Sequence, residues 1–210
     1  MARQLLNCLQ IADDLISITY PPSLNRTAIA ASLRALPHFK EVVEGIDSIC
    51  VQFDPLTQNA QTLLAMLQKT AAHISDAPQA NPDTFTIPID YSPSAAPDLD
   101  QVCESLGIDR TAFITAHTSK TYPIEIIGFT PGFAYISGAD WNIPRLKQPR
   151  IRVPAGSIGI AGGYTGIYAL EGPGGWPLIG RTHATLFDAA QDDPFILKAG
   201  MQVKFEAVKS

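Results

Sequence analysis

Gly128-Phe-Thr-Pro-Gly-Phe-Ala-Tyr-Ile-Ser-Gly138 opens a stretch, ending at Gly180, that holds twelve of the fifteen glycines of this 210-residue chain. Between the glycines lie short apolar runs, among them Ile151 to Val153, Ser157 to Ala161 and Gly166 to Leu170. Short apolar runs separated by glycine are typical of short strands joined by tight turns. The stretch therefore predicts a closed β-barrel with a few helices.

The barrel domain is expected to begin upstream of this stretch. The patterns there are those of a strand at Thr84 to Asp90, short helices at Asp98 to Leu106 and Asp109 to His117, and a buried strand at Ile124 to Phe129. Residues 77–83 are rich in Pro, Asn and Asp and lack periodicity, which indicates a linker. We therefore place the barrel domain at residues 84–210.

The N-terminal part, residues 1–76, has a different pattern. Strand-like runs lie at Leu5 to Ile11, Leu15 to Tyr20, Val42 to Ile46 and Ser48 to Phe53, and helix-like runs extend from Ser23 or Asn25 to Pro37 and from Leu56 to about His73. The order ββαββα predicts two helices on one face of a four-stranded antiparallel sheet. The fold class is thus expected to be α+β, with two domains.

Composition excludes several classes of protein. A formal net charge of −5 argues against a nucleic-acid partner, because neutralising phosphates requires a dominant basic surface. The first residues lack the apolar run of a signal peptide, and no later stretch is long and apolar enough to span a bilayer. Cys8, Cys50 and Cys103 fit neither a disulfide framework nor a zinc motif. We expect a cytoplasmic protein that contacts no membrane and holds no metal.

One segment of this acidic chain is locally basic. Between Ile126 and Phe187 the only acids are Asp140 and Glu171, against the five bases Arg145, Lys147, Arg150, Arg152 and Arg181. Arg150 and Arg152 alternate with Ile151 and would share one face of a strand. The planar fork of arginine suits carboxylate or phosphate, so one interpretation is an anion-binding pocket. The other is a solvated barrel exterior or a contact with a partner.

Several motifs follow one another in this half of the chain. After Gly128 to Gly138 come Pro144-Arg145, Pro149-Arg-Ile-Arg-Val-Pro-Ala-Gly-Ser-Ile-Gly159, Ala161-Gly-Gly-Tyr-Thr-Gly-Ile-Tyr168, Gly172-Pro-Gly-Gly-Trp176 and Gly180-Arg-Thr182. In this order they resemble the family that includes the 5-oxoprolinase B subunits, the allophanate hydrolase subunit 1 domain of urea carboxylases and the sporulation kinase inhibitor KipI. Tyr164 departs from the family pattern, which has glutamine there.

The resemblance implies a fold and an activity. It implies a cyclophilin-like β-barrel behind the small α+β domain, and a subunit of an ATP-dependent enzyme that converts 5-oxoproline to L-glutamate. The implied partners are a homologous C-type subunit, which would share a composite site, and a LamB/YcsF-like A-type subunit. Glycines 159, 162, 163 and 166 form neither the P-loop nor the dinucleotide-binding pattern, so ATP is expected at the level of the complex.

Seven residues are candidates for the site. His117 and Arg150 are the catalytic candidates, and the candidates for binding a small anionic substrate are Tyr135, Arg145, Tyr168, Trp176 and Arg181. The imidazole of His117 suits proton transfer at neutral pH, but a structural histidine at a helix end is an open alternative. Trp176 is either a ligand platform or a core aromatic residue.

Two other functions stay open at this point. The first is an inhibitor of a sensor histidine kinase, in the manner of KipI. The second is half of a biotin-dependent urea-type carboxyltransferase, although this chain has no biotin-carrier region of its own.

Overall fold

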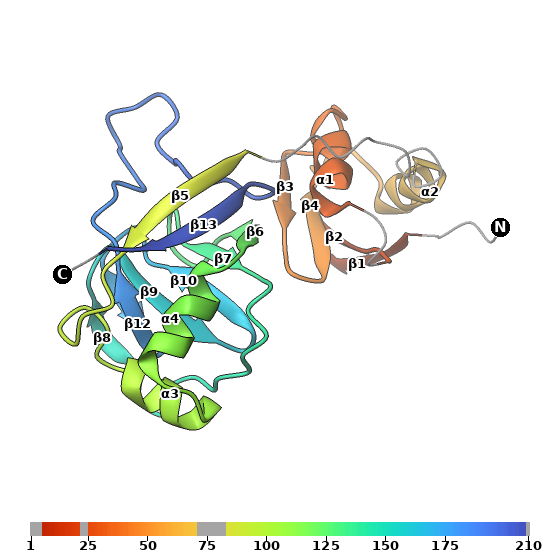
Figure 1. Cartoon of the computed structure of the whole chain (residues 1–210). Helices are drawn as coiled ribbons and strands as arrows, with labels where there is room; N and C mark the ends of the chain where they lie inside the picture. The colour runs from red at the N-terminus through yellow and green to blue at the C-terminus, as the bar shows by residue number, and fades with distance from the viewer. Residues whose placement is uncertain (1–5, 22–24, 71–82, 209–210) are drawn as a thin grey trace. The chain divides into compact units, whose positions relative to one another are not determined.

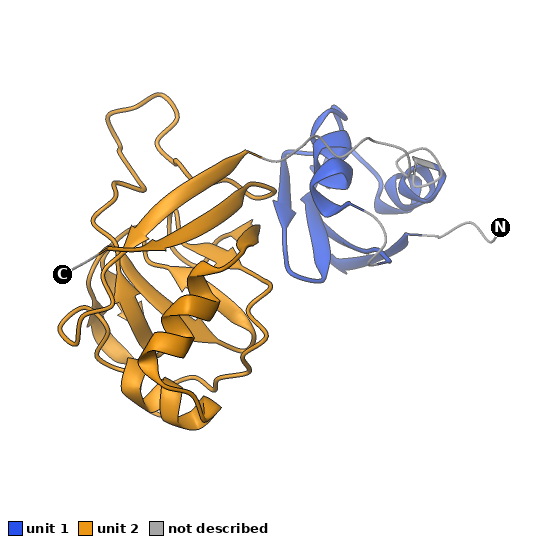
Figure 2. Ribbon diagram, viewed as in Figure 1, with its two compact units in different colours: residues 1–81 blue, residues 82–210 orange. Residues whose placement is uncertain are grey.

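The computed structural model describes residues 6–21, 25–70 and 83–208. The chain divides into two compact units, Met1–Asn81 and Pro82–Ser210 (Figure 2). Of the expected linker at residues 77–83, only Asp83 lies within the described residues. The boundary between the units falls inside the segment where the sequence places that linker.

The first unit has the predicted ββαββα order. Its elements are β1 (Asn7–Ala12), β2 (Leu15–Thr19), α1 (Arg26–Arg34), β3 (Glu41–Glu44), β4 (Ser48–Gln52) and α2 (Ala60–Thr70). The strands form one antiparallel sheet in the order β1-β2-β4-β3. Alternate residues of β2 and β4 are fully buried, and they share one core with apolar residues of both helices. Both helices therefore cover the same face of this sheet.

Helix boundaries in this unit follow local capping groups. The side chain of Asn25 accepts a hydrogen bond from the Ala28 backbone N–H, and α1 begins at the next residue. The second helix starts later than the expected Leu56, at Ala60. Residues after Asp54 form a turn, in which the Gln58 N–H donates to the Asp54 carbonyl, and the Asn59 side chain accepts from the Gln61 and Thr62 N–H groups. Periodicity alone does not reveal this turn.

The second unit is built around a nearly closed barrel-like sheet. Its strands are β5 (Thr84–Ile89), β6 (Thr121–Ile127), β7 (Ala134–Ile136), β8 (Arg150–Val153), β9 (Ser157–Ala161), β10 (Tyr164–Ile167), β11 (Gly172–Gly174), β12 (Leu178–Arg181) and β13 (Gln202–Ala207). Seven of them pair in the order β12-β9-β10-β7-β6-β13-β5, and β8 pairs separately with β11. Figure 1 shows β5 beside β13, to which it is parallel.

The two edges of the seven-stranded sheet meet at a single backbone bridge. Asp90, just after β5, and Arg181, at the end of β12, exchange two backbone hydrogen bonds of 2.8 and 3.0 Å. Edge strands leave backbone N–H and C=O groups without hydrogen-bond partners, and this bridge pairs some of these groups on both edges. The predicted barrel is therefore observed in a nearly closed form.

Two helices pack against this sheet. They are α3 (Leu99–Leu106), which contacts β12, and α4 (Arg110–Thr118), which contacts β13 (Figure 1). Gly107 ends α3 in the left-handed conformation, and the Asp109 side chain caps α4. Leu99, Val102 and Phe113 reach the main apolar core of the unit.

Strand β10 begins and ends earlier than the run expected at Gly166 to Leu170. Gly162 and Gly163, both with positive φ, turn the chain between β9 and β10, so the new strand starts at once with Tyr164. This register places Thr165 and Ile167 toward the barrel interior and Tyr164, Gly166 and Tyr168 toward the opposite face.

Candidate functional site

Aromatic side chains gather on the outer face of β7, β9 and β10. Phe133 is the centre of this group, which we call the outer aromatic cluster; its other members are Tyr135, Tyr164, Tyr168 and Trp176. The ring of Phe133 lies 4.8 Å from Tyr135, 4.9 Å from Tyr168 and 5.6 Å from Trp176, each in an edge-to-face arrangement. Such geometry is favourable between aromatic rings and fixes their orientation.

Two glycines in the strands make room for these rings. A Cβ atom added at Gly166 would lie 2.5 Å from Phe133 Cζ and 2.7 Å from Trp176 Cζ3. One added at Gly159 would lie 2.9 Å from Trp176 Cβ. The indole of Trp176 therefore lies against bare backbone, which no other residue type would allow here.

Most of the outer aromatic cluster is buried. Phe133, Tyr168 and Trp176 are 1%, 2% and 6% exposed, so they form a small second core, whereas Tyr135 and Tyr164 are half-buried. The neighbouring Phe129 is 63% exposed, touches Phe133 edge-on and has a positive φ of 71°. A bulky residue held in that backbone region stores strain, which is typical of functional loops.

The charges of two candidate arginines act on the hydroxyl of Tyr168. Burial raises the pKa of Tyr168, while a hydrogen bond with the Trp176 backbone and the charges of Arg145 and Arg150 act in the opposite direction. Gly174 also touches this hydroxyl, since a Cβ there would lie 2.3 Å from it. The structure thus brings Tyr135, Tyr168, Trp176, Arg145 and Arg150 to one region.

Arg150 is held by an ion pair that the sequence analysis missed. Its Nη2 donates to Asp98 Oδ1 at 2.7 Å, and the Leu178 N–H donates to Asp98 Oδ2 at 2.6 Å. Nη1 of Arg150 is buried and has no hydrogen-bond partner among the described residues. One half of this guanidinium is therefore fixed, and the other half holds a buried donor without a partner among the described residues.

Arg152 and Arg181 lie elsewhere. Arg152 pairs with Glu171 at 2.8 Å on the solvent side, where Ile151 is also 93% exposed, so this part of β8 fits the solvated exterior. Arg181 Nε donates to the Ala155 carbonyl at 3.1 Å beside the bridge that joins the sheet edges. Among the described residues it makes no ion pair, and its substrate-binding role stays a prediction.

His117 is in the barrel interior, apart from the outer aromatic cluster. It is fully buried; Nδ1 lies 2.6 Å from the Tyr91 hydroxyl, Nε2 lies 3.4 Å from Thr165 Oγ1, and the ring stacks on Phe205 at 4.4 Å. Burial lowers the pKa of His117 to about 3, so the ring is neutral at neutral pH. This environment favours the structural alternative, while proton transfer stays a prediction.

Other kinds of site find little support in the described part of the chain. No three His, Cys, Asp or Glu residues there lie close enough together to hold a metal ion. None of the described helices is long and apolar enough to cross a membrane. The outer aromatic cluster with Arg145 and Arg150 is the candidate site of this chain.

Comparison with known proteins shows which family this chain is similar to. Residues 8–197 match the model of the family described as "Carboxyltransferase domain, subdomain C and D". The chain is 34% identical over 182 residues to the 5-oxoprolinase B subunit of Escherichia coli O157:H7, covering 84% of this chain and 82% of that one. It is 35% identical over 214 residues to the 5-oxoprolinase B subunit of Haemophilus influenzae, covering 95% and 97%.

Solved structures share the fold. TTHA0988 superimposes with a TM-score of 0.77 at 30% identity, over 93% of this chain and 40% of that one. The urea carboxylase of Kluyveromyces lactis superimposes with a TM-score of 0.76 at 20% identity, over 97% of this chain and 22% of that one. The second likeness concerns the fold alone. Since the family match and the curated relatives extend over most of the chain, this protein belongs to the family of 5-oxoprolinase B subunits.

Proposed function

We propose that this chain is the B subunit of a 5-oxoprolinase complex that converts 5-oxoproline to L-glutamate with consumption of ATP. The observation that carries the proposal is identity of 34% and 35% with two 5-oxoprolinase B subunits over most of both chains. The proposed partners are a C-type subunit of related sequence and a LamB/YcsF-like A-type subunit. The chain alone is expected to be inactive.

The reaction requires activation of a poor electrophile. One water molecule adds across the amide C–N bond of 5-oxoproline, giving the amine and second carboxylate of glutamate. A second water molecule converts ATP to ADP and phosphate, and this hydrolysis drives the ring opening. Charge develops on oxygen atoms in both halves of the reaction, so fixed cationic donors would stabilise it.

The proposed contribution of this chain is anion binding beside an aromatic wall. Arg150 is oriented by Asp98, and its buried Nη1 has no hydrogen-bond partner among the described residues. A carboxylate or phosphate oxygen would bind this donor once the groups that cover it move aside. The charge of Arg145 also acts on the Tyr168 hydroxyl, and Tyr135 and Phe129 offer aromatic surface that is not fully buried. The larger, buried aromatic residues Tyr168 and Trp176 would hold this surface in shape.

A glycine-rich phosphate loop does not fit the described residues. Gly159 and Gly166 lie beneath Phe133 and Trp176, and Gly162 with Gly163 forms a hairpin turn. Their backbone is therefore already engaged and does not form a cradle at a helix N-terminus. The groups that this chain would offer to ATP are its arginines, and in this proposal partner subunits complete the ATP site.

Reconstitution tests this proposal. Glutamate release from 5-oxoproline and ATP is measured for the chain alone, with each partner subunit, and with both. Activity is expected only in the full mixture, and Arg150→Ala should lower kcat/KM by roughly tenfold or more while the complex still assembles, as for loss of a charge-stabilising donor. Arg152→Ala, which removes an equal charge from the same strand, should change it by less than about twofold.

Other outcomes would redirect the assignment. A folded, assembled complex without glutamate release contradicts the proposal. Carboxyl transfer from a biotin carrier to urea, assayed in the same preparations, would then favour the carboxyltransferase function. Inhibition of a sensor histidine kinase would favour the KipI-like function.

A further inference from the structure

A second concave site lies beside α3. It is a cavity of about 380 Å³, within the range of small-molecule sites. Its floor is mainly apolar, formed by Val102 of α3, by Ile143 and Leu146 of the irregular segment before β8, and by Pro177 before β12. The cavity is thus assembled from three stretches of chain that are distant in sequence.

The walls of this cavity are fixed by backbone hydrogen bonds. The Gly162 N–H donates to the Ile143 carbonyl at 2.8 Å, and the Leu146 N–H donates to the Gly175 carbonyl at 2.7 Å. At the start of α3 the Asp98 N–H donates to the Leu178 carbonyl at 3.0 Å, and the Asp98 side chain binds the Leu178 N–H. An irregular segment tied down at both ends gives a preformed site, which lowers the entropic cost of binding.

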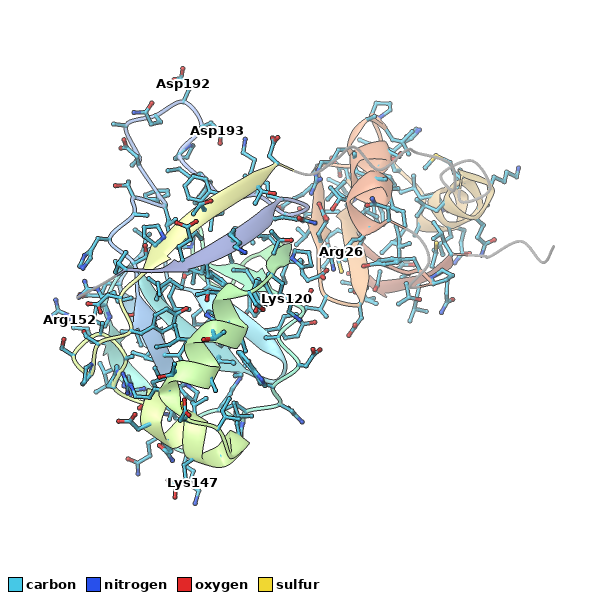
Figure 3. The ribbon with its side chains drawn as sticks, in the orientation of Figure 1. Arg26, Lys120, Lys147, Arg152, Asp192 and Asp193 are labelled. Atoms are coloured by element: carbon cyan, nitrogen blue, oxygen red, sulfur yellow. The ribbon has the colours of Figure 1, made fainter. Side chains whose placement is uncertain are left out.

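Two cations at the rim lack acidic partners. Arg145 and Lys147 line the cavity and are exposed, and within residues 83–208 neither makes an ion pair or a side-chain hydrogen bond. Other exposed bases of the unit are paired, for example Arg152 with Glu171 and Lys120 with Asp140. Figure 3 shows Lys147 and Arg152 apart on the surface of the barrel unit. Unpaired cations above an apolar floor suit a ligand with an anionic group and an apolar body.

We propose that this α3 cavity binds a small anion, a carboxylate or phosphate, that carries a compact ring. Arg145 and Lys147 hold the anionic group, and Val102, Ile143 and Pro177 contact the ring. Only the choice of probes rests on the proposed function: 5-oxoproline is a carboxylate on a ring, ATP is a phosphate chain on a base, and inorganic phosphate is an anion without a ring. Arg145 belongs both to this cavity and to the candidate site beside Tyr168, whereas Lys147, Val102, Ile143 and Pro177 belong to the cavity alone.

Calorimetric titration of the isolated full chain with each of the three probes tests the proposal. At least one of 5-oxoproline and ATP is expected to bind saturably and roughly fivefold or more tightly than inorganic phosphate, because only these two carry a ring for the apolar floor; which one does so identifies the source of the anion. Replacing both rim cations, Arg145→Ala with Lys147→Ala, should weaken that binding by about tenfold or more. Arg152→Ala, with loss of one charge outside the cavity, should change it by less than about twofold.

A cavity-filling variant separates this site from a general charge effect. Ser105 lies on α3 and lines the cavity, so Ser105→Trp should fill it without burying a new group in the core. Loss of binding in this variant, with an unchanged circular dichroism spectrum, supports the proposal. No saturable binding of any probe, or unchanged binding in Ser105→Trp, overturns it. Because titration needs no partner subunit, a failure of glutamate release in reconstitution leaves this result unaffected.

Discussion

The two faces of β9 and β10 differ in the residues that they carry. Toward the interior, Ile158, Ile160 and Ile167 alternate along the strands, and the polar pair His117 and Thr165 is fully buried. Toward the exterior, Gly159 and Gly166 replace side chains with bare backbone on which Phe133 and Trp176 lie. The interior face closes the barrel, and the exterior face carries a second aromatic cluster that is mostly buried.

This difference shows how one sheet supplies both stability and a site. The interior polar atoms have protein partners, which reduces the penalty of burying them. On the exterior, a buried Nη1 of Arg150 is left without a partner among the described residues, and Phe129 holds a strained backbone conformation. Unsatisfied donors and strained residues cost stability, and backbone strain of this kind is common at functional sites.

Gly166 offers the strongest test of the exterior face. Gly166→Ala places a Cβ 2.5 Å from Phe133 Cζ, and because both facing rings are buried, the cost should be about 3 kcal/mol of unfolding free energy. Urea denaturation followed by tryptophan fluorescence measures it. Gly172→Ala is the matched control, since its Cβ meets nothing within 4 Å, and it should change stability by less than about 0.5 kcal/mol. Equal effects at the two glycines would refute the steric argument.

Asp98 joins the exterior face to α3 and comes next in size. Asp98→Ala removes both the partner of Arg150 and the acceptor of the Leu178 N–H, and should cost about 2 kcal/mol because the arginine is only partly exposed. Asp100→Ala breaks an ion pair with Arg110, but that aspartate is 77% exposed and the cost should be at most about 1 kcal/mol. Thermal unfolding of the two variants compares them. A smaller loss in Asp98→Ala than in Asp100→Ala would contradict the assigned role of Asp98.

Much of the fold follows from local sequence patterns. The strands at Thr84 and Ser157, the helices capped by Asn25 and Asp109, and the ββαββα order are set by periodicity and capping, which are local properties. The pairing of β13 with β5 and the bridge from Asp90 to Arg181 join residues that are far apart along the chain. No local pattern encodes such pairs.

The candidate site was predicted less completely than the fold, because it too depends on contacts between residues that are far apart along the chain. Tyr135, Tyr168 and Trp176 were found because motifs mark them, and the structure brings them together around Phe133. Asp98, which orients Arg150, lies 52 residues away and carries no motif. His117 looked suited to proton transfer by residue type, but its burial depends on the closed barrel. The segment from Ile126 to Phe187 contains few acids, and this was the one signal that the carboxylate partner of Arg150 comes from another part of the chain.

His117 tests the interior face through pH. Its pKa in the fold is about 3, below the ordinary value of 6.5, so the unfolded chain binds a proton that the folded chain does not. Titration of this histidine therefore leaves the free energy of unfolding unchanged above pH 6.5. Below pH 6.5 the unfolded chain takes up the proton, and the free energy of unfolding falls by about 1 kcal/mol per pH unit. Urea denaturation at about pH 7 and about pH 5 measures the slope.

Two variants isolate this slope. His117→Gln keeps hydrogen-bonding capacity without a titrating ring, so its stability should fall less between the two pH values than that of the wild type. His183→Gln replaces an exposed histidine and is the matched control for the substitution itself. A wild-type slope that persists in His117→Gln would mean that other groups cause it and that His117 is not held neutral by burial.

The smallest effect is expected at the solvated end of β8, and it sharpens the contrast between two arginines on one strand. Arg152 and Glu171 are 76% and 46% exposed, against 30% and 12% for Arg150 and Asp98. A double-mutant cycle on the exposed pair should give a coupling of about 0.3 kcal/mol that vanishes in high salt, because water and ions screen it. The same cycle on Arg150 and Asp98 should give a larger coupling that persists in salt, since the pair is mostly shielded from solvent. Equal couplings would mean that Arg150 is as free as Arg152 and that Asp98 does not orient it for anion binding.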